Sequence, residues 1–437
     1  MKKIVLLLIL AIIGASDFYV GAKAPLTVEQ KAFIVSRFCS EIKYNFVHYD
    51  KLKFDWDSLC MVSLPKLCAT KNDADFIKGL KRLNARLCDG HTYIRTQRGW
   101  NEGDDKDREK PFPLTTRLIE GRVIVENVWS KALRKRGIVR GCEIISIDGE
   151  NVIDYGYRTI EPFVYSSTAQ WTRYRVFSGY EITKASGGRK TRIVFKTTEG
   201  EYIEVASSRN KLDWDLYVDE YKGCFEYKLL DGNIGYLKVN NFVQNDFVKK
   251  KFDKIYKKIL KTDGLIIDLR DNGGGNSYYA DWMMSHFCDT LIGKGKWETP
   301  QYVATYASWN RPRKRLVVDG QPIKPVAEKE RYLKPMCVLV SERTFSSAEN
   351  FCLLFRNASR GELIGVATGG SSGNPILMDL GYGVECAICT REEFFSDETP
   401  FVGVGIIPDV EVKETVESYR AGRDEALECA VSKILGK

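Results

Sequence analysis

The stretch LIIDLRDNGGG, residues 265–275, joins an unbroken apolar run to three consecutive glycines. Apolar runs of this kind are typical of strands whose two faces are both covered by helices. Glycines at the carboxyl end of such a strand let the backbone approach a ligand and expose its N–H groups, and ligands of open α/β sheets bind at that end. The stretch therefore predicts a parallel α/β sheet and a candidate site after Asp268, although the glycines alone would also suit a plain turn.

The segments around this stretch repeat the alternation of strand and helix. We expect strands at 234–239, 336–340 and 363–366 and helices at 247–260 and 347–355. Such βαβ units imply a mostly parallel sheet covered by helices, so the predicted fold class is α/β. The expected organisation is a helical region at 25–100, a charged linker at 101–110, a β-rich domain at 108–210 and the α/β core at 220–437.

The amino terminus has the pattern of an export signal. Two lysines precede an apolar run at 4–13, and small residues follow at 14–16 and 21–22. This order is typical of a secretory signal peptide, which we place at residues 1–22, and the apolar run is too short to span a membrane stably. We therefore expect a periplasmic or extracellular protein, the alternative being a buried amino-terminal helix.

Composition excludes several classes of function. The net charge of +8 arises from 66 basic and 58 acidic side chains spread along the whole chain, which predicts no nucleic-acid partner. The basic cluster at 311–315 is expected to be a solvated loop. The twelve cysteines permit disulfides after export, yet several lie in apolar runs as buried thiols would. Cys386 and Cys389 have CxxC spacing without a second pair, in a segment that reads as a strand, so we expect no metal and no cofactor there or elsewhere.

A second junction of strand and helix carries the sequence TFSSAE at 344–349. A serine at a helix amino terminus is ordinarily a cap. The same position suits a nucleophile, because the helix dipole and the free N–H groups stabilise negative charge on a neighbouring oxygen. Together with the glycine run, these N–H groups could form an oxyanion hole for an acyl-transfer reaction.

A serine nucleophile needs a base, and the chain has only three histidines. No lysine lies between Lys334 and Lys413, so a lysine base would have to come from elsewhere. His48 lies among aromatic residues and His286 in an apolar helix, which indicates structural roles for both. His91 follows a helix at a chain reversal and is the histidine most suited to a functional role.

Five segments follow one another along the chain: a leucine-containing helix ending in DGHT (89–92), a β-rich domain (112–210), DLRDNGGG (268–275), TFSSAE (344–349) and GVGIIPDVEV (403–412). In this order they resemble the elements of the S41 serine peptidases, the carboxyl-terminal processing and tricorn-core group. The resemblance covers nearly the whole mature chain. It implies a ClpP/crotonase-like core with an embedded PDZ-like domain.

The resemblance also implies roles for individual residues. Ser346 takes the position of the nucleophile, and the oxyanion donors fall on the N–H groups of Ser347 and of Gly274 or Gly275. The processing branch of the family uses a lysine base downstream of the serine, but Ser371 occupies that position here.

The tricorn-like branch instead uses a histidine of the DGHT-like element, and His91 fits that position. In that branch a carboxylate orients the histidine from a position shortly before the closing segment. Asp397 and Glu398 are the nearest acids, a few residues out of register, and Val402 stands at one suitable position. We carry Glu398 forward as the candidate acid.

The expected function is therefore that of an exported serine endopeptidase. His91 would remove the proton of Ser346, which would attack the peptide carbonyl and form an acyl-enzyme. The PDZ-like domain would bind an extended or carboxyl-terminal peptide by strand addition. The alternative is a catalytically inactive relative that binds peptides or lipids.

Overall fold

The computed structural model describes residues 25–97, 109–215, 223–243, 246–396 and 398–436. The predicted signal peptide at 1–22 and most of the expected linker lie outside these residues. None of the helices in the described ranges combines the length and the apolar character needed to cross a membrane.

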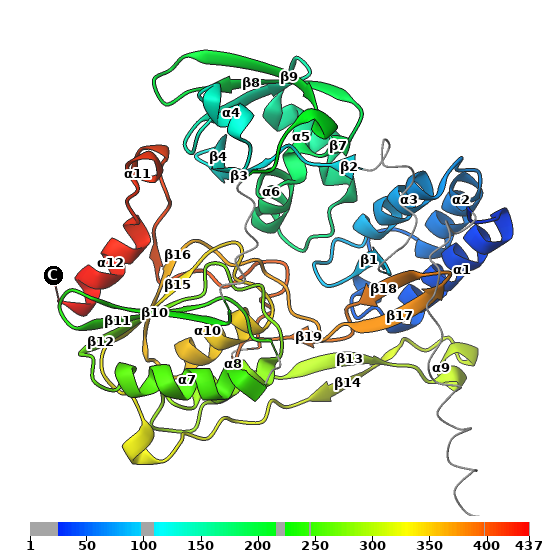
Figure 1. The fold of residues 1–437 in the computed structure, drawn as a ribbon. Helices are drawn as coiled ribbons and strands as arrows, with labels where there is room; N and C mark the ends of the chain where they lie inside the picture. Colours follow the sequence, from blue (N-terminus) through cyan, green and yellow to red (C-terminus); the bar gives the residue numbers. More distant parts are fainter. Residues whose placement is uncertain (1–24, 98–108, 216–222, 244–245, 397, 437) are drawn as a thin grey trace, which may run out of the picture.

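A six-stranded sheet forms the centre of the carboxyl-terminal half (Figure 1). Its strands in spatial order are β10 (Phe225–Leu230), β11 (Ile234–Val239), β12 (Gly264–Asp268), β15 (Met336–Val340), β16 (Gly361–Gly365) and β20 (Val410–Glu411). All neighbours from β11 to β20 are parallel, and β10 pairs antiparallel to β11. The predicted parallel core is therefore present.

Helices cover both faces of this sheet, which explains the continuous apolar strands. The helices are α7 (Asp246–Ile259), α8 (Ser277–Met284), α10 (Ser347–Asn357) and α12 (Glu425–Ile434). In β12, Leu265 and Ile267 pack with α7, α8 and α10, whereas Ile266 faces the opposite side and packs with α12. Alternating side chains thus enter two separate hydrophobic cores, so the three consecutive positions 265–267 are all apolar.

The amino-terminal region consists of α1 (Val28–Asn45), α2 (Trp56–Cys68) and α3 (Asp73–Ala85), followed by β1 (Tyr93–Thr96). These helices do not form a core alone. They share one with the hairpin of β17 (Ile376–Gly381) and β18 (Val384–Ile388), which pairs antiparallel with β1. A disulfide joins Cys39 of α1 to Cys60 of α2. The amino-terminal helices therefore depend on a segment from the far end of the chain.

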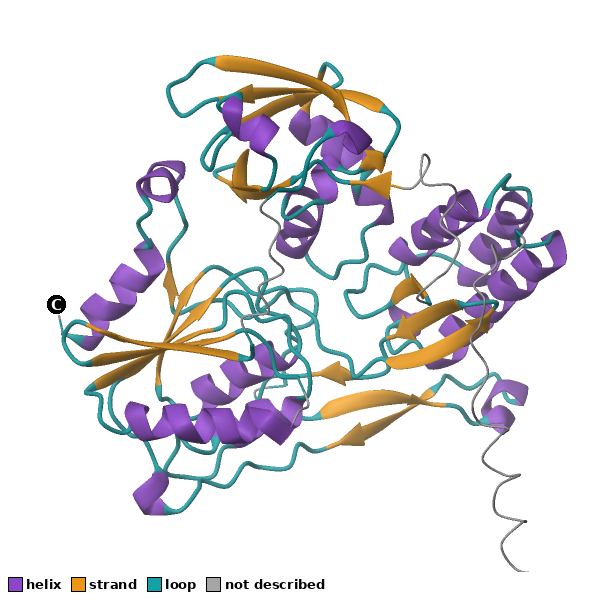
Figure 2. Ribbon diagram, in the orientation of Figure 1, coloured by secondary structure: helices purple, strands orange, loops and turns teal. Residues whose placement is uncertain are grey.

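The middle segment contains a separate sheet with its own hydrophobic core. Its strands are β3 (Leu114–Ile119), β4 (Arg122–Val128), β5 (Glu143–Ile147), β8 (Lys190–Lys196) and β9 (Tyr202–Ser208), with β6 (Glu150–Asn151) paired to β5. Its helices are α4 (Lys131–Lys135), α5 (Val152–Thr159) and α6 (Ala169–Phe177), and a short ladder joins β2 (Glu109–Lys110) to β7 (Ala185–Ser186). Figure 2 shows the strands and helices of this segment apart from the central sheet.

An extended arm connects the core to the amino-terminal helices. It consists of β13 (Trp297–Gln301), α9 (Ala304–Ser308) and β14 (Lys314–Val318), and β19 (Glu392–Glu393) pairs with β13. The remaining helix, α11 (Val416–Ala421), does not belong to the arm and precedes α12. The prediction of a solvated loop at 311–315 is wrong for its second half. Arg315 lies in β14 and forms ion pairs with Glu298 and Glu392, because these two half-buried or buried carboxylates need a compensating charge.

Candidate active site

The two strand ends singled out in the sequence meet in the structure. The segment after β12 and the segment after β15 leave the carboxyl ends of neighbouring parallel strands. The backbone N–H of Phe345 donates to the carbonyl of Asn272 at 3.0 Å. Gly274 has a φ of +97°, and a Cβ placed on it would lie 2.7 Å from the Cβ of Ser346. The absence of a side chain at Gly274 therefore lets the glycine run lie directly against Ser346.

Ser346 occupies a strained backbone conformation at the start of α10. Its φ and ψ are 58° and −123°, a region that non-glycine residues rarely adopt. Such strain persists only where the surrounding structure enforces it, and it clusters at functional sites. A serine on a sharp turn between a strand and a helix presents its hydroxyl at the carboxyl edge of the sheet.

His91 connects two serine hydroxyl groups. Its Nε2 lies 3.0 Å from Ser346 Oγ, and its Nδ1 lies 2.8 Å from Ser371 Oγ. The side chain is buried, and burial lowers the pKa of His91 to about 4, although the nearby Asp89 carboxylate acts in the opposite direction. The ring is therefore neutral at pH 7. If Nε2 accepts the Ser346 proton, Nδ1 carries a hydrogen and donates it to Ser371.

The structure does not bring Glu398 to His91. The Glu398 side chain is 69% exposed, and its carboxylate pairs with Lys296 at 2.9 Å. Glu398 closes a turn in which its N–H donates to the Phe395 carbonyl, and this turn directs the side chain towards solvent. Asp397 lies outside the described residues. In the described part of the chain, the partner at His91 Nδ1 is a hydroxyl and not a carboxylate.

Glu349 holds the backbone of both serines that flank His91. Its fully buried carboxylate accepts the N–H groups of Ser346 and Ser371, each at 3.0 Å, and that of Gly370 at 2.8 Å. The hydroxyl of Thr368 is a fourth donor. Burial raises the pKa of Glu349 to about 7, although these donors act to lower it. The sequence motif contained Glu349, but its link to the 368–371 loop is visible only in three dimensions.

The expected oxyanion donors need one correction. The N–H of Gly274 donates to Asn272 Oδ1 at 2.8 Å, so its single hydrogen is already engaged. Ser347 is the first residue of α10, where a backbone N–H has no partner within the helix. The bridge between Gly275 and Phe242 uses the N–H of Asn276 and the carbonyl of Gly274, and leaves the Gly275 N–H outside it. Ser347 and Gly275 remain the candidate donors.

The middle segment supports the site through a stack of three rings. His91 stacks on Phe345 with centroids 4.7 Å apart, and Phe345 stacks on Trp171 of α6 at 4.4 Å. Beside this stack, the N–H of Gly90 donates to Ser167 Oγ at 2.8 Å. The middle segment therefore contacts Phe345 and Gly90, the residues that directly precede Ser346 and His91 in the chain.

The two other histidines lie elsewhere. His286 packs edge-on against Phe252, Tyr256 and Trp282, and its Nδ1 is 2.9 Å from the Trp282 carbonyl. His286 is thus a packing residue, as the sequence indicated. His48 is mostly buried beside Glu392 at the end of α1, with its Nδ1 3.9 Å from that carboxylate.

Comparison with known proteins agrees with this geometry. Residues 233–412 match the model of peptidase family S41. Over these residues the chain is therefore similar to the S41 peptidases. A carboxy-terminal-processing protease of Bartonella bacilliformis is 26% identical over 202 residues, which are 45% of this chain and 43% of that protein. The aligned part thus spans less than half of the relative's length. These matches support the expected class of enzyme, a serine peptidase.

Two solved structures share the fold over nearly the whole chain. The structure of mature CPAF complexed with lactacystin has a TM-score of 0.71 and 15% sequence identity, and the match covers 94% of this chain and 99% of that one. A crystal structure of mature CPAF has the same TM-score and identity, with coverages of 93% and 96%. At these identities the likeness establishes the fold alone.

Proposed function

We propose that this protein is a serine endopeptidase with Ser346 as nucleophile and His91 as general base. The observation that carries the proposal is the 3.0 Å separation of Ser346 Oγ and His91 Nε2, which is within hydrogen-bond reach. His91 takes the hydroxyl proton while Ser346 Oγ attacks the peptide carbonyl. The N–H groups of Ser347 and Gly275 then stabilise the oxyanion. His91 passes the proton to the leaving amine, and water hydrolyses the acyl-enzyme.

The hydroxyl of Ser371 supports a His-base variant of this chemistry without an orienting carboxylate. As an acceptor at Nδ1, Ser371 Oγ favours the tautomer in which Nε2 is free to accept the Ser346 proton. A hydroxyl carries no charge, so it stabilises the imidazolium less than a carboxylate does. Altering the carboxylate lowers kcat about 10⁴-fold in a well-studied Ser-His-Asp triad, so we expect slow turnover here.

The substrate in this proposal is an extended peptide bound by a PDZ-like middle domain. Strand β3 forms one edge of the middle sheet and lies against α6. A cavity of about 770 Å³ borders this edge, with Arg117, Tyr174 and Asp271 among its lining residues. Thr116 already pairs with Gly179 through its backbone, so the part of this edge beyond Thr116, next to the cavity, is the part that suits strand addition by a peptide. The cavity leads to the carboxyl end of β12, from which the glycine run continues towards Ser346.

Export supports the same assignment. The amino-terminal sequence has the pattern of a signal peptide, and the disulfide between Cys39 and Cys60 is of the kind that persists in oxidising compartments. We therefore place the enzyme in the periplasm or outside the cell.

A fluorophosphonate probe tests the proposed chemistry, because it reacts covalently with activated serines. The wild-type protein should be labelled, and Ser346→Ala should abolish labelling. Ser347→Ala is the matched control, since it removes the neighbouring hydroxyl while keeping the backbone N–H. A second candidate function, peptide binding without catalysis, is favoured by the missing carboxylate at His91. Equal labelling of wild type and Ser346→Ala, or labelling of neither, would support that second function.

A further inference from the structure

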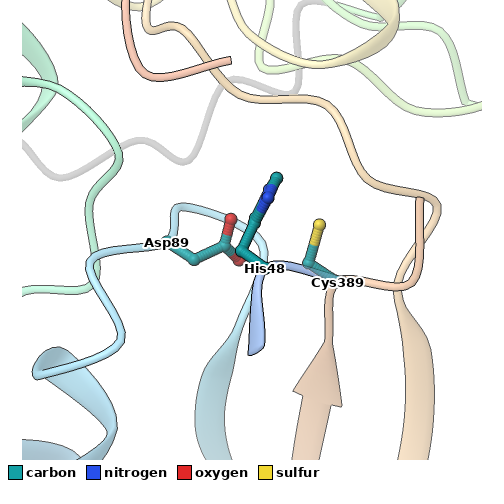
Figure 3. A group of neighbouring side chains, drawn as sticks. All are labelled: His48, Asp89 and Cys389. Carbon is teal, nitrogen blue, oxygen red and sulfur yellow. The ribbon is translucent and has the colours of Figure 1, made fainter. Parts of the chain in front are cut away.

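A second group of chemically reactive side chains lies next to the loop that carries His91 and takes no part in the proposed mechanism. His48, Asp89 and Cys389 each offer one metal-ligating atom, and these atoms all lie within 4.8 Å of one another. Figure 3 shows the three side chains converging from three separate segments of the chain. His48 follows α1, Asp89 precedes the catalytic histidine, and Cys389 follows β18.

Two polar atoms of this group are buried without a partner. Asp89 is 2% exposed, and its Oδ1 accepts no hydrogen bond, while Oδ2 accepts the His91 N–H at 3.0 Å. Nε2 of His48 is likewise buried and unpartnered. Buried polar atoms are rarely left unsatisfied, and each such atom calls for a ligand, water or ion.

The charges around the group point to a cation. The neighbouring carboxylate of Glu392 pairs with Lys51 and Arg315. Asp89 forms no ion pair within the described residues, so its buried carboxylate lacks a compensating charge of the kind that Glu392 has. A divalent cation held by one carboxylate and one thiolate would be electrically neutral overall.

We propose that His48, Asp89 and Cys389 bind a zinc ion. The ligand atoms are His48 Nε2, Asp89 Oδ1 and Cys389 Sγ, and water completes a tetrahedral coordination. Nitrogen, sulfur and carboxylate oxygen are the donors that zinc takes, whereas calcium and magnesium favour oxygen alone. Binding replaces the thiol proton of Cys389, which leaves to solvent.

The surroundings of the ligands suit this role. Nδ1 of His48 lies 3.9 Å from Glu392 Oε2, so a small movement would give it the carboxylate partner that commonly orients a metal-bound histidine. Gly373 packs directly against the sulfur, because a Cβ placed there would lie 2.2 Å from Cys389 Sγ. The zinc would tie α1, β18 and the loop of His91 together, and it would hold that loop through Asp89. This site is independent of the proposed peptidase activity.

The test is metal analysis of the full mature chain, purified without a histidine tag and dialysed after exposure to zinc. We expect about one zinc per wild-type molecule and loss of most of it in Cys389→Ser and in His48→Gln. Cys386→Ser, a buried cysteine on the strand that precedes Cys389, and Cys88→Ser, the exposed cysteine next to Asp89, are matched controls and should keep the metal. Equal zinc in all five proteins, or none in the wild type, would overturn the proposal.

Cobalt substitution of the wild type keeps the test decisive if a variant fails to fold. A thiolate-to-cobalt charge-transfer band together with the visible bands of tetrahedral cobalt is the expected result, and both should persist in Cys88→Ser and Cys386→Ser. Absence of the charge-transfer band would show that Cys389 does not bind the metal, and would overturn the proposal. Neither readout depends on activity, so failure here is distinguishable from failure of the peptidase assignment.

Discussion

The Nδ1 atom of His91 lies 2.8 Å from the hydroxyl oxygen of Ser371, on the opposite side of the ring from Ser346. Ser371 occupies the sequence position at which the processing branch has a lysine base. Its hydroxyl also occupies the place beside Nδ1 at which a Ser-His-Asp triad has an orienting carboxylate. Because Glu349 holds the backbone of Ser346 and of Ser371, the geometry on both sides of the histidine depends on one buried side chain.

Replacing Ser371 tests whether its hydroxyl positions the base. Ser371→Ala removes the acceptor at Nδ1 and should lower kcat about fivefold with little change in KM, since one hydrogen bond contributes about 1 kcal/mol. Ser372→Ala is the control, because the Ser372 hydroxyl donates to Glu393 instead of His91. Steady-state kinetics on a fluorogenic peptide would measure both. An unchanged kcat in Ser371→Ala would remove Ser371 from the mechanism.

The pH dependence of kcat/KM should reflect the burial of His91. Burial lowers the pKa of His91 to about 4, so the ring stays neutral and able to accept a proton from about pH 5 upwards. The acidic limb of the profile should therefore lie near pH 4 and not near the ordinary value of 6.5. Initial rates measured between about pH 3.5 and about pH 8 would locate this limb, because that range includes both the lowered and the ordinary pKa of a histidine. A limb at 6.5 would contradict a buried base.

Glu349→Gln should change how stability depends on pH. Burial raises the pKa of Glu349 to about 7, so the folded state binds this proton more tightly than the unfolded chain does. The contribution to stability is complete below about pH 4.5 and is lost as the pH rises through 7.

The wild type's advantage in unfolding free energy over Glu349→Gln should therefore shrink by roughly 3 kcal/mol between about pH 4.5 and pH 8. Subtracting the variant cancels the contribution of His91, whose lowered pKa has the opposite sign. Urea unfolding at several pH values measures the difference. Glu362→Gln, which removes a surface carboxylate paired with Lys433, should show no such trend. A constant difference would indicate that Glu349 stays ionised.

Trp171→Ala tests whether the middle segment supports the site. Loss of the ring under Phe345 should destabilise the protein by about 3–5 kcal/mol and lower the rate of fluorophosphonate labelling at Ser346. Trp309→Ala provides the control, since Trp309 lies on the arm and is 57% exposed. Thermal unfolding and labelling rates measured at a temperature where both variants are folded separate the two effects. Labelling at the wild-type rate would limit Trp171 to a purely structural role.

Much of the core, and the two residues of the proposed catalytic pair, could be predicted from local patterns. A parallel sheet was predicted from the apolar strands at 265–267 and 336–340 and from the glycine run. Burial on both faces requires consecutive apolar residues, and close approach of the backbone requires glycines. Ser346 and His91 stood at chain reversals beside such elements. Structure was needed for groups whose role depends on contact between distant segments.

Three examples show what the sequence lacked. In the sequence, Ser371 was noted only because it replaces a lysine. No local sequence pattern predicts that its hydroxyl lies beside a histidine. Glu398 was chosen by its distance from the closing segment, but a single tight turn directs its side chain to solvent. Gly274 carries the expected N–H, yet the side chain of Asn272 occupies it. The spacing of residues in the sequence predicts which segments lie near the site. The direction of a side chain or an N–H group depends on the turns around it.

The pairing of β1 with β18 has a consequence for the order of biosynthesis. His91 and Ser346 are 255 residues apart in the chain, and the hairpin that completes the amino-terminal core lies later still. The nascent chain cannot form this pairing until nearly all of it has been synthesised, and contacts so distant in sequence form slowly. The proposed catalytic pair is therefore expected to assemble among the last parts of the molecule, so an incomplete chain should lack peptidase activity.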